Sequence, residues 1–180
     1  MEKLFLAAFL TFGLLQVTAA QSYYTEEGFA GFRSETPLLT FNGTTNSLVG
    51  KIDLDNNTID FYIDLLTLKT GIAKRDRDMY ETLEVEEYPF AEFFGELTSD
   101  FDPQSNQKQE VTVNGNFKVH GVEREVTIDG TLQKTEKGLK VSANWILELT
   151  NYDIDPPSLL NYKVNNELTL GIEAVLKPQS

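Results

Sequence analysis

Histidine is the side chain most often used for acid–base chemistry near neutral pH, and His120 is the only one in this sequence of 180 residues. A Ser-His-Asp triad would therefore have to use it. It lies in "KVHGVERE", which has the pattern of a tight turn between two strands and offers no adjacent base partner. We therefore predict a solvated turn residue, and a histidine-rich zinc site is excluded by count.

Acidic side chains point to two further chemistries. Asp53, Asp55 and Asn57 stand at alternate positions, as ligands do in a calcium-binding loop. Thr58 occupies the position at which a calcium-binding loop needs glycine for its sharp turn, and the segments on either side have the pattern of strands rather than helices. Calcium binding is therefore disfavoured. Four glutamates within residues 81–87 are typical of a solvated face rather than of a glycosidase carboxylate pair. Cysteine is absent, which excludes thiol catalysis, so the sequence predicts no catalytic residue and no metal site.

The densest group of cationic side chains lies where the alternation of apolar and polar residues along the chain stops. It lies in "KTGIAKRDRDMYETLEVEEYPF", residues 69–90, where four of the 15 Lys and Arg fall close together in a chain of net charge −13. The four are Lys69, Lys74, Arg75 and Arg77. Residues 74–85 are the one stretch that suits a short helix. Balancing Asp76, Asp78 and Glu81 is one role for the cluster, since surface ion pairs are common and individually weak.

Alternation of apolar and polar residues, the pattern of strands with one wet face, extends over most of the remaining chain. In residues 51–66 it runs in two segments around a turn at Asn56 and Asn57, which predicts a β-hairpin. Similar segments follow as far as Leu176, for a total of about eight strands. A lone sheet buries its apolar face most simply by closing on itself. We therefore predict an all-β fold, an eight-stranded antiparallel barrel, with a β-sandwich as the alternative.

The first 20 residues have the layout of a secretory signal peptide. Lys3 precedes an apolar run, residues 4–15, which is too short to span a bilayer, and Thr18 and Ala20 suit cleavage before Gln21. We expect residues 21–180 to form a single soluble domain in the periplasm or secreted from a bacterial cell. The net charge stays at −13 after cleavage, which repels nucleic acid and anionic membrane surfaces.

Several motifs, taken in order, resemble the YceI-like family of lipid-binding proteins. Around the basic cluster these are Thr70-Gly71, Arg75-Asp76, Tyr88-Pro89 and the aromatic segment of residues 90–94. "GKIDLD" precedes them, and "VNGNFKVHGVEREVTI" and "VNNELTLGIEAVL" follow, so the resemblance covers nearly all of residues 21–180. The chain departs from the family at Asp78-Met79, where His followed by Leu is frequent, and at Thr82-Leu83, which replace an aromatic pair.

The resemblance implies an extended, lipocalin-like barrel that holds an isoprenoid or similar long-chain amphiphilic lipid in its interior, with no catalysis and no cofactor. The helical excursion would border one end of the barrel, with Met79, Leu83 and Val85 packed toward the apolar interior. The cations of the excursion become candidate contacts for a polar or anionic head group: Lys74, Arg75 and Arg77. The expected partner is the lipid, with no nucleic acid, no stable membrane insertion and a homodimer as one option.

Inward-facing apolar side chains of the predicted strands are the candidate lining of a tunnel for this lipid. Each buried methylene contributes roughly 0.8 kcal/mol, so a tail binds with few polar contacts. Core packing is the alternative role of each residue, and a shift of register by one residue would reverse a whole strand. The candidates are Ile52, Leu54, Phe61, Ile63, Phe93, Leu97, Phe117, Val119, Val141, Trp145, Leu147, Leu168, Leu170 and Ile172.

Two functions from other classes stay open on the sequence alone. One is an envelope hydrolase or isomerase that acts on a lipid or glycan through carboxylates at the barrel mouth, namely Asp76, Asp78 or Glu81. The other is a stress-related interaction module with a filled core, for which the absence of an internal cavity would be evidence.

Overall fold

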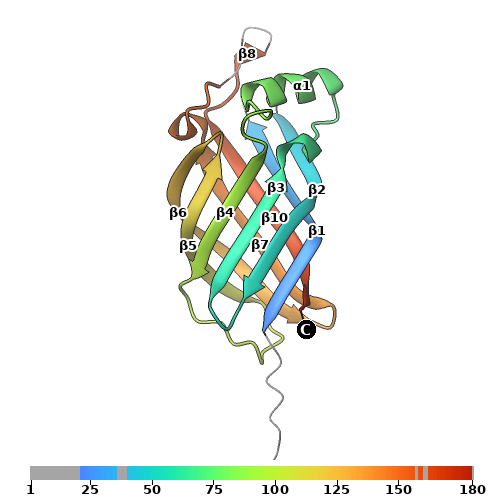
Figure 1. Ribbon diagram of the computed structural model, residues 1–180, viewed down its shortest axis with the longest axis vertical. Coiled ribbons are helices and arrows are strands. Elements are labelled where there is room, and N and C mark those ends of the chain that lie inside the picture. The colour runs from blue at the N-terminus through green and yellow to red at the C-terminus, as the bar shows by residue number, and fades with distance from the viewer. Residues whose placement is uncertain (1–20, 36–39, 157, 160–161, 180) are drawn as a thin grey trace, which may run out of the picture.

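Eight strands form a closed antiparallel barrel in the computed structural model, which describes residues 21–35, 40–156, 158–159 and 162–179 (Figure 1). Around the barrel the order is β1, β10, β7, β6, β5, β4, β3 and β2. The strands are Ser22–Glu35 (β1), Thr40–Asp53 (β2), Thr58–Asp64 (β3), Phe90–Leu97 (β4), Gln109–Val119 (β5), Val122–Thr135 (β6), Gly138–Glu148 (β7) and Glu167–Pro178 (β10). The predicted eight-stranded barrel is therefore confirmed, and each of these strands has a partner on both sides.

Short elements gather at the upper end of the barrel in Figure 1. The 3-10 helix η1 (Leu65–Thr67) and the helix α1 (Ala73–Thr82) connect β3 to β4. The 3-10 helix η2 (Leu149–Tyr152) and the small hairpin of β8 (Ser158–Leu159) and β9 (Tyr162–Lys163) connect β7 to β10. The helical excursion predicted near residues 74–85 is confirmed, although α1 ends at Thr82 and Glu84 takes a left-handed φ of 47°.

Two observations concern the predicted export of the protein. None of the helices within the described ranges is long and apolar enough to cross a membrane. The predicted signal peptide, residues 1–20, lies outside the described residues.

The alternation read from the sequence places side chains on the two faces of the barrel wall, because successive side chains of a strand point in opposite directions. In β7, Leu139, Val141 and Leu147 are buried inside, whereas Asn144 and Ile146 are exposed outside. Strand β1 is less regular, since its register against β2 shifts on both sides of Gly28. These shifts explain why alternation alone defines β1 poorly.

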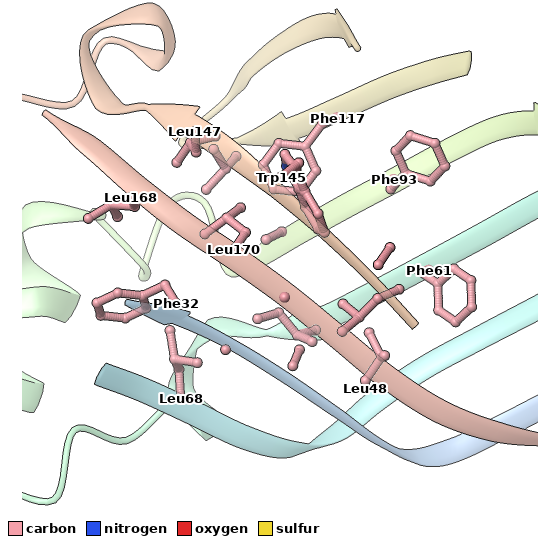
Figure 2. Close-up of a pocket in the computed structure, with 18 of the residues that line it drawn as sticks. Phe32, Leu48, Phe61, Leu68, Phe93, Phe117, Trp145, Leu147, Leu168 and Leu170 are labelled. Atoms are coloured by element: carbon pink, nitrogen blue, oxygen red, sulfur yellow. The ribbon is translucent and has the colours of Figure 1, made fainter. Parts of the chain in front are cut away.

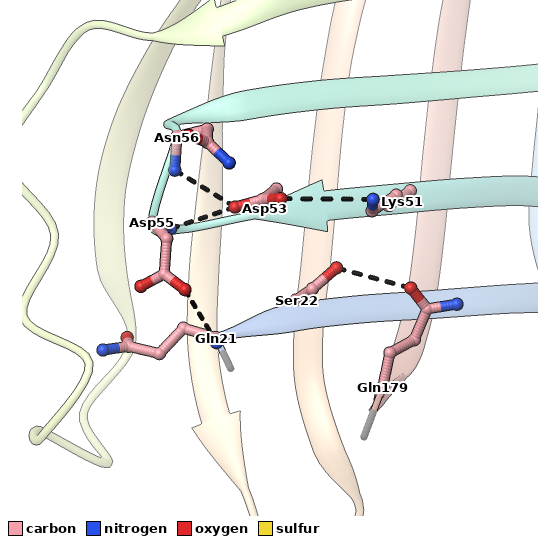
Figure 3. A network of polar contacts seen from close by, with 7 residues as sticks. All are labelled: Gln21, Ser22, Lys51, Asp53, Asp55, Asn56 and Gln179. Carbon is pink, nitrogen blue, oxygen red and sulfur yellow. Dashed lines mark hydrogen bonds and ion pairs between the residues drawn. The ribbon is translucent and has the colours of Figure 1, made fainter. Parts of the chain in front are cut away.

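Polar contacts fasten the lower end of the barrel, where the two described ends of the chain meet (Figure 3). The backbone N–H of Gln179 donates to the carbonyl of Ser22 over 2.8 Å, and that of Gln21 donates to Asp55 Oδ2 over 3.3 Å. Asp53 Oδ1 accepts from the N–H groups of Asp55 and Asn56, both at 3.1 Å. Hydrogen bonds from Asn56 hold the pKa of Asp53 below its usual value.

The segment that resembles a calcium loop is therefore a hairpin turn. Asn57 has a left-handed φ of 56° at the end of this turn, a conformation that asparagine tolerates. No group of three potential metal-binding side chains occurs in the part of the chain that the structure describes.

Candidate binding cavity

The interior of the barrel contains a cavity of about 220 Å³. By the same measure one water molecule needs roughly 10–15 Å³, so the space is far larger than a packing defect. Its lining comes from all eight barrel strands, from η1 and α1 above them, and from the connection between β7 and β10. Figure 2 shows side chains from these strands converging on this space.

The wall of the cavity is almost wholly apolar. Phe32, Phe61, Phe93, Phe117 and Trp145 contribute aromatic rings, and aliphatic side chains fill the spaces between them (Figure 2). Phe117 packs edge-on against Trp145, with ring centroids 5.7 Å apart. Such a wall attracts hydrocarbon through burial of apolar surface, without directional contacts.

Glycines in β2 leave room for two of these rings to lie along the wall. Gly50 pairs with Phe61 across β2 and β3, and a Cβ at Gly50 would come within 1.9 Å of the Phe61 ring. Gly43 pairs with Phe32 across β1 and β2, and a Cβ there would come within 2.2 Å of that ring. The rings therefore occupy space above the neighbouring backbone, and the lumen beside them stays open.

Most of the side chains predicted to line a tunnel lie on this wall. Of the 14 predicted, Ile52, Leu54 and Leu97 are not in the lining. Ile52 and Leu97 are buried at the lower end, where Leu139 and Leu176 help to fill the barrel. For these three residues the predicted place on the wall does not hold, because alternation gives the face of a strand and not the depth along the barrel. The eleven in the lining are Phe61, Ile63, Phe93, Phe117, Val119, Val141, Trp145, Leu147, Leu168, Leu170 and Ile172.

The alternation of the sequence does not mark several other residues of the lining. Phe32, Phe41 and Leu48 lie on β1 and β2, and Leu68 and Val164 lie on connections at the upper end. The register between β1 and β2 shifts at Gly28, which pairs with Leu48, so the period of two is broken there. One signal in the sequence could have identified this part of the lining, namely an aromatic residue that pairs with a glycine on the next strand. Phe32 and Gly43 form such a pair.

The helix α1 forms the upper boundary of the cavity. Met79 and Leu83 line it, as predicted, whereas Val85 is buried in the core outside the lining. Asp78 and Thr82 add polar atoms at this end. We call this end of the barrel the mouth; α1 gives it charged groups, whereas Thr131 and Ser142 add only hydroxyl groups on β6 and β7.

The three predicted head-group contacts occupy different environments. Arg75 is half-buried, lines the cavity and places its Cζ 4.8 Å from the centroid of the Phe41 ring. Lys74 is exposed and pairs with Asp78, with 2.8 Å between Nζ and Oδ2. Arg77 is exposed outside the lining. Ion pairing thus accounts for Lys74, and only Arg75 faces the interior.

A buried carboxylate holds α1 in place over the mouth. Asp76 Oδ1 accepts hydrogen bonds from the backbone N–H of Thr70, over 2.7 Å, and from its hydroxyl, over 2.6 Å. These bonds from Thr70 lower the pKa of Asp76. Tyr80 makes a second tie, because its hydroxyl donates to the carbonyl of Leu68 over 2.8 Å and accepts from Lys69 Nζ over 2.5 Å. Both ties join α1 to the segment that follows η1.

His120 joins two of the upper connections. It sits in the predicted turn between β5 and β6 with a φ of 53°, but its side chain is only 12% exposed, so the prediction of a solvated residue is wrong. Its Nδ1 lies 3.1 Å from the carbonyl oxygen of Tyr152, and its Nε2 lies 3.3 Å from Glu84 Oε2. The ring also packs against Tyr88, with centroids 5.3 Å apart. These contacts cover the imidazole and give it a structural role.

A closed eight-stranded barrel with an apolar cavity has room in its interior for one small ligand. Residues 20–176 match the YceI-like domain, and the chain belongs to that family. No curated protein matches the chain.

Solved structures share the fold at low sequence identity. A polyisoprenoid-binding domain from Saccharophagus degradans, implicated in plant cell wall breakdown, has a TM-score of 0.75 at 14% identity, over 89% of this chain and 99% of that one. BcnA of Burkholderia cenocepacia has a TM-score of 0.66 at 14% identity, over 81% and 94%. The YCEI protein of Campylobacter jejuni has a TM-score of 0.54 at 15% identity, over 99% and 100%.

Proposed function

We propose that this protein is an exported, non-catalytic carrier that holds an isoprenoid or similar long-chain amphiphile inside its barrel. The cavity carries this proposal, because its wall is mostly apolar and its charged residues lie on α1 and near the start of β4. The family supports it, as does the likeness to a domain described as polyisoprenoid-binding. The tail would lie among the aromatic rings, and the head group would lie at the mouth beside α1.

The expected gain in free energy lies mainly in the tail. Each methylene removed from water contributes roughly 0.8 kcal/mol, so a chain of several isoprene units needs no hydrogen bond along its length. Arg75 supplies the head-group contact, since its guanidinium has five N–H donors and suits a phosphate or a carboxylate. Its stacking on Phe41 keeps those donors at the mouth.

The two other functions have less support. Asp76 is held by Thr70 and Asp78 by Lys74, so two of the carboxylates proposed for a hydrolase already have partners. The third, Glu81, is exposed on α1. A filled-core interaction module is disfavoured by the cavity itself.

Fluorescence of Trp145 offers a direct test of binding. It is the only tryptophan of the chain and it lines the cavity. Titration of the delipidated protein with a long-chain isoprenoid alcohol should change its emission in a saturable manner, at one ligand per chain. A short water-soluble isoprenoid alcohol is the control, because it buries too few methylenes to bind tightly. No saturable change with the long chain would contradict the proposal.

A further inference from the structure

Exposed apolar side chains occur in several elements at the α1 end of the barrel. Leu66 in η1 is 51% exposed and Ile72, just before α1, is 50% exposed. Phe90 begins β4 at the same end and is 43% exposed, and its ring packs edge-on against that of Tyr62 on β3, with centroids 5.8 Å apart. We call these four residues the rim patch.

Backbone contacts join parts of the rim patch to α1 and to the start of β4. The hydroxyl of Tyr80 on α1 lies 3.1 Å from the carbonyl oxygen of Leu66. The N–H of Leu65 donates to the carbonyl of Pro89, which places η1 beside the start of β4. The backbone carbonyl of Ile72 accepts from the N–H of Asp76. Apolar side chains therefore flank the mouth on the side where α1 is fastened to the barrel.

Cationic side chains lie next to this patch. Lys69, Lys74 and Arg77 are exposed on α1 and on the segment that precedes it. Asp76 and Asp78 lie among these cations on α1, Asp78 pairs with Lys74, and further acidic residues follow from Glu81 onward. The excess of cations at this end therefore lies in residues 69–77, on either side of Ile72. Exposed leucine, isoleucine and aromatic side chains beside lysine and arginine are typical of surfaces that bind the interface of a lipid bilayer.

We propose that the rim patch docks the mouth reversibly onto a lipid bilayer, from which the ligand enters the barrel. This inference rests on the proposed carrier function, because docking at the mouth spares an apolar tail from crossing water. Four half-exposed side chains offer roughly 300–400 Å² of surface, well below the ~800 Å² per partner of a stable protein interface, so a bilayer fits better than a second copy. The net charge of −13 opposes extended contact with anionic lipid and confines docking to this cationic end.

Vesicles of phosphatidylcholine and phosphatidylglycerol provide the test. The double variant Leu66→Ser/Ile72→Ser removes two side chains of the rim patch. The control, Phe94→Ser/Val175→Ser, removes two exposed apolar side chains farther from the mouth, which are 59% and 39% exposed. Co-sedimentation with vesicles should fall roughly tenfold in the rim variant and stay near the wild-type level in the control. Equal binding of the two variants, or no binding of the wild type, would overturn the proposal.

Uptake of an isoprenoid alcohol separates docking from carriage. Uptake from vesicles should slow roughly tenfold in the rim variant, whereas uptake of the same alcohol added from ethanol should be unchanged. If the wild type takes up no alcohol by either route, the carrier function fails, and docking is judged by co-sedimentation alone. If the rim variant only converts a dimer to a monomer and binds vesicles as before, the patch is a contact between copies and the proposal is wrong.

Discussion

Arg75 is the only cation among the described residues that line the cavity. Replacing it with methionine keeps an unbranched apolar stem and removes the hydrogen bonds of the guanidinium to a charged head group. We expect the affinity for an isoprenoid phosphate to fall about 10- to 100-fold, because such bonds contribute roughly 1.5–3 kcal/mol. Affinity for the corresponding alcohol should change much less. Titrations that follow Trp145 emission measure both values.

Arg77→Met is the matched control for this experiment. Arg77 is exposed on the same helix, outside the lining of the cavity. Its replacement should leave both affinities near the wild-type values. Equal losses in the two variants would show that long-range charge, and not contact with Arg75, attracts the phosphate.

Asp76 links the position of α1 to pH. Hydrogen bonds from Thr70 lower its pKa in the folded protein, so the ionised form is favoured by folding. Its contribution to stability is present above the unfolded pKa of about 3.9 and is lost as the pH falls through the lower folded value. Asp76→Asn should therefore lower the free energy of unfolding near neutral pH by about 1–2 kcal/mol. The gap from wild type should close as the solution becomes strongly acidic.

Thermal unfolding at a series of pH values tests this prediction. Asp78→Asn is the control, because Asp78 makes only an ion pair with the exposed Lys74, which contributes little. A gap between wild type and Asp76→Asn that does not narrow on acidification would contradict the role given to the carboxylate.

At the scale of elements, β2 and β3 keep the lumen open through the pairing of Gly50 with Phe61. Gly50→Ala places a methyl group against the ring, and the ring must then move toward the cavity. We expect a loss of about 1–3 kcal/mol in the free energy of unfolding, together with weaker binding of long tails. Gly50→Ala/Phe61→Leu should recover part of both, because leucine leaves room for the methyl group. Chemical denaturation and Trp145 titrations check the two effects, and an undiminished stability in Gly50→Ala would contradict this packing.

The strands differ in how well the alternation of the sequence predicts their place in the cavity wall. On β7 and β10 strict alternation predicts the wall correctly, since Trp145, Leu147 and Leu170 all line the cavity. Alternation gives no information on depth along the barrel. It therefore assigns Ile52 and Phe61 to the same inward face, although only Phe61 lies at the depth of the cavity. Nor does it resolve β1 and β2, where register shifts near Gly28 break the period of two.

The helix α1 illustrates a different limit. Its position near residues 74–85 followed from the break in alternation, but which of its cations faces inward did not. The orientation of α1 depends on the hydrogen bonds between Asp76 and Thr70 and between Tyr80 and Leu68. Hydrophobic periodicity does not predict such contacts between a helix and the loop before it.

At the scale of the whole molecule, a ligand that binds only the folded barrel must stabilise it. At 100 times the dissociation constant the gain is about 2.7 kcal/mol, and a protein of this size gains roughly 2–4 °C in Tm per kcal/mol. A long-chain isoprenoid should therefore raise Tm by about 5–10 °C, and a short-chain homologue by far less. Scanning calorimetry of the delipidated protein measures the shift, and equal shifts for the two chain lengths would count against a cavity that holds the tail.

The proposed function requires a lipid inside the barrel, and native mass spectrometry of the protein purified from its own host measures this most directly. We predict a mass above that of the polypeptide by one long-chain lipid per chain, which organic extraction then releases and identifies. A mass equal to the bare polypeptide, together with no uptake of isoprenoid by the delipidated protein, would contradict the account.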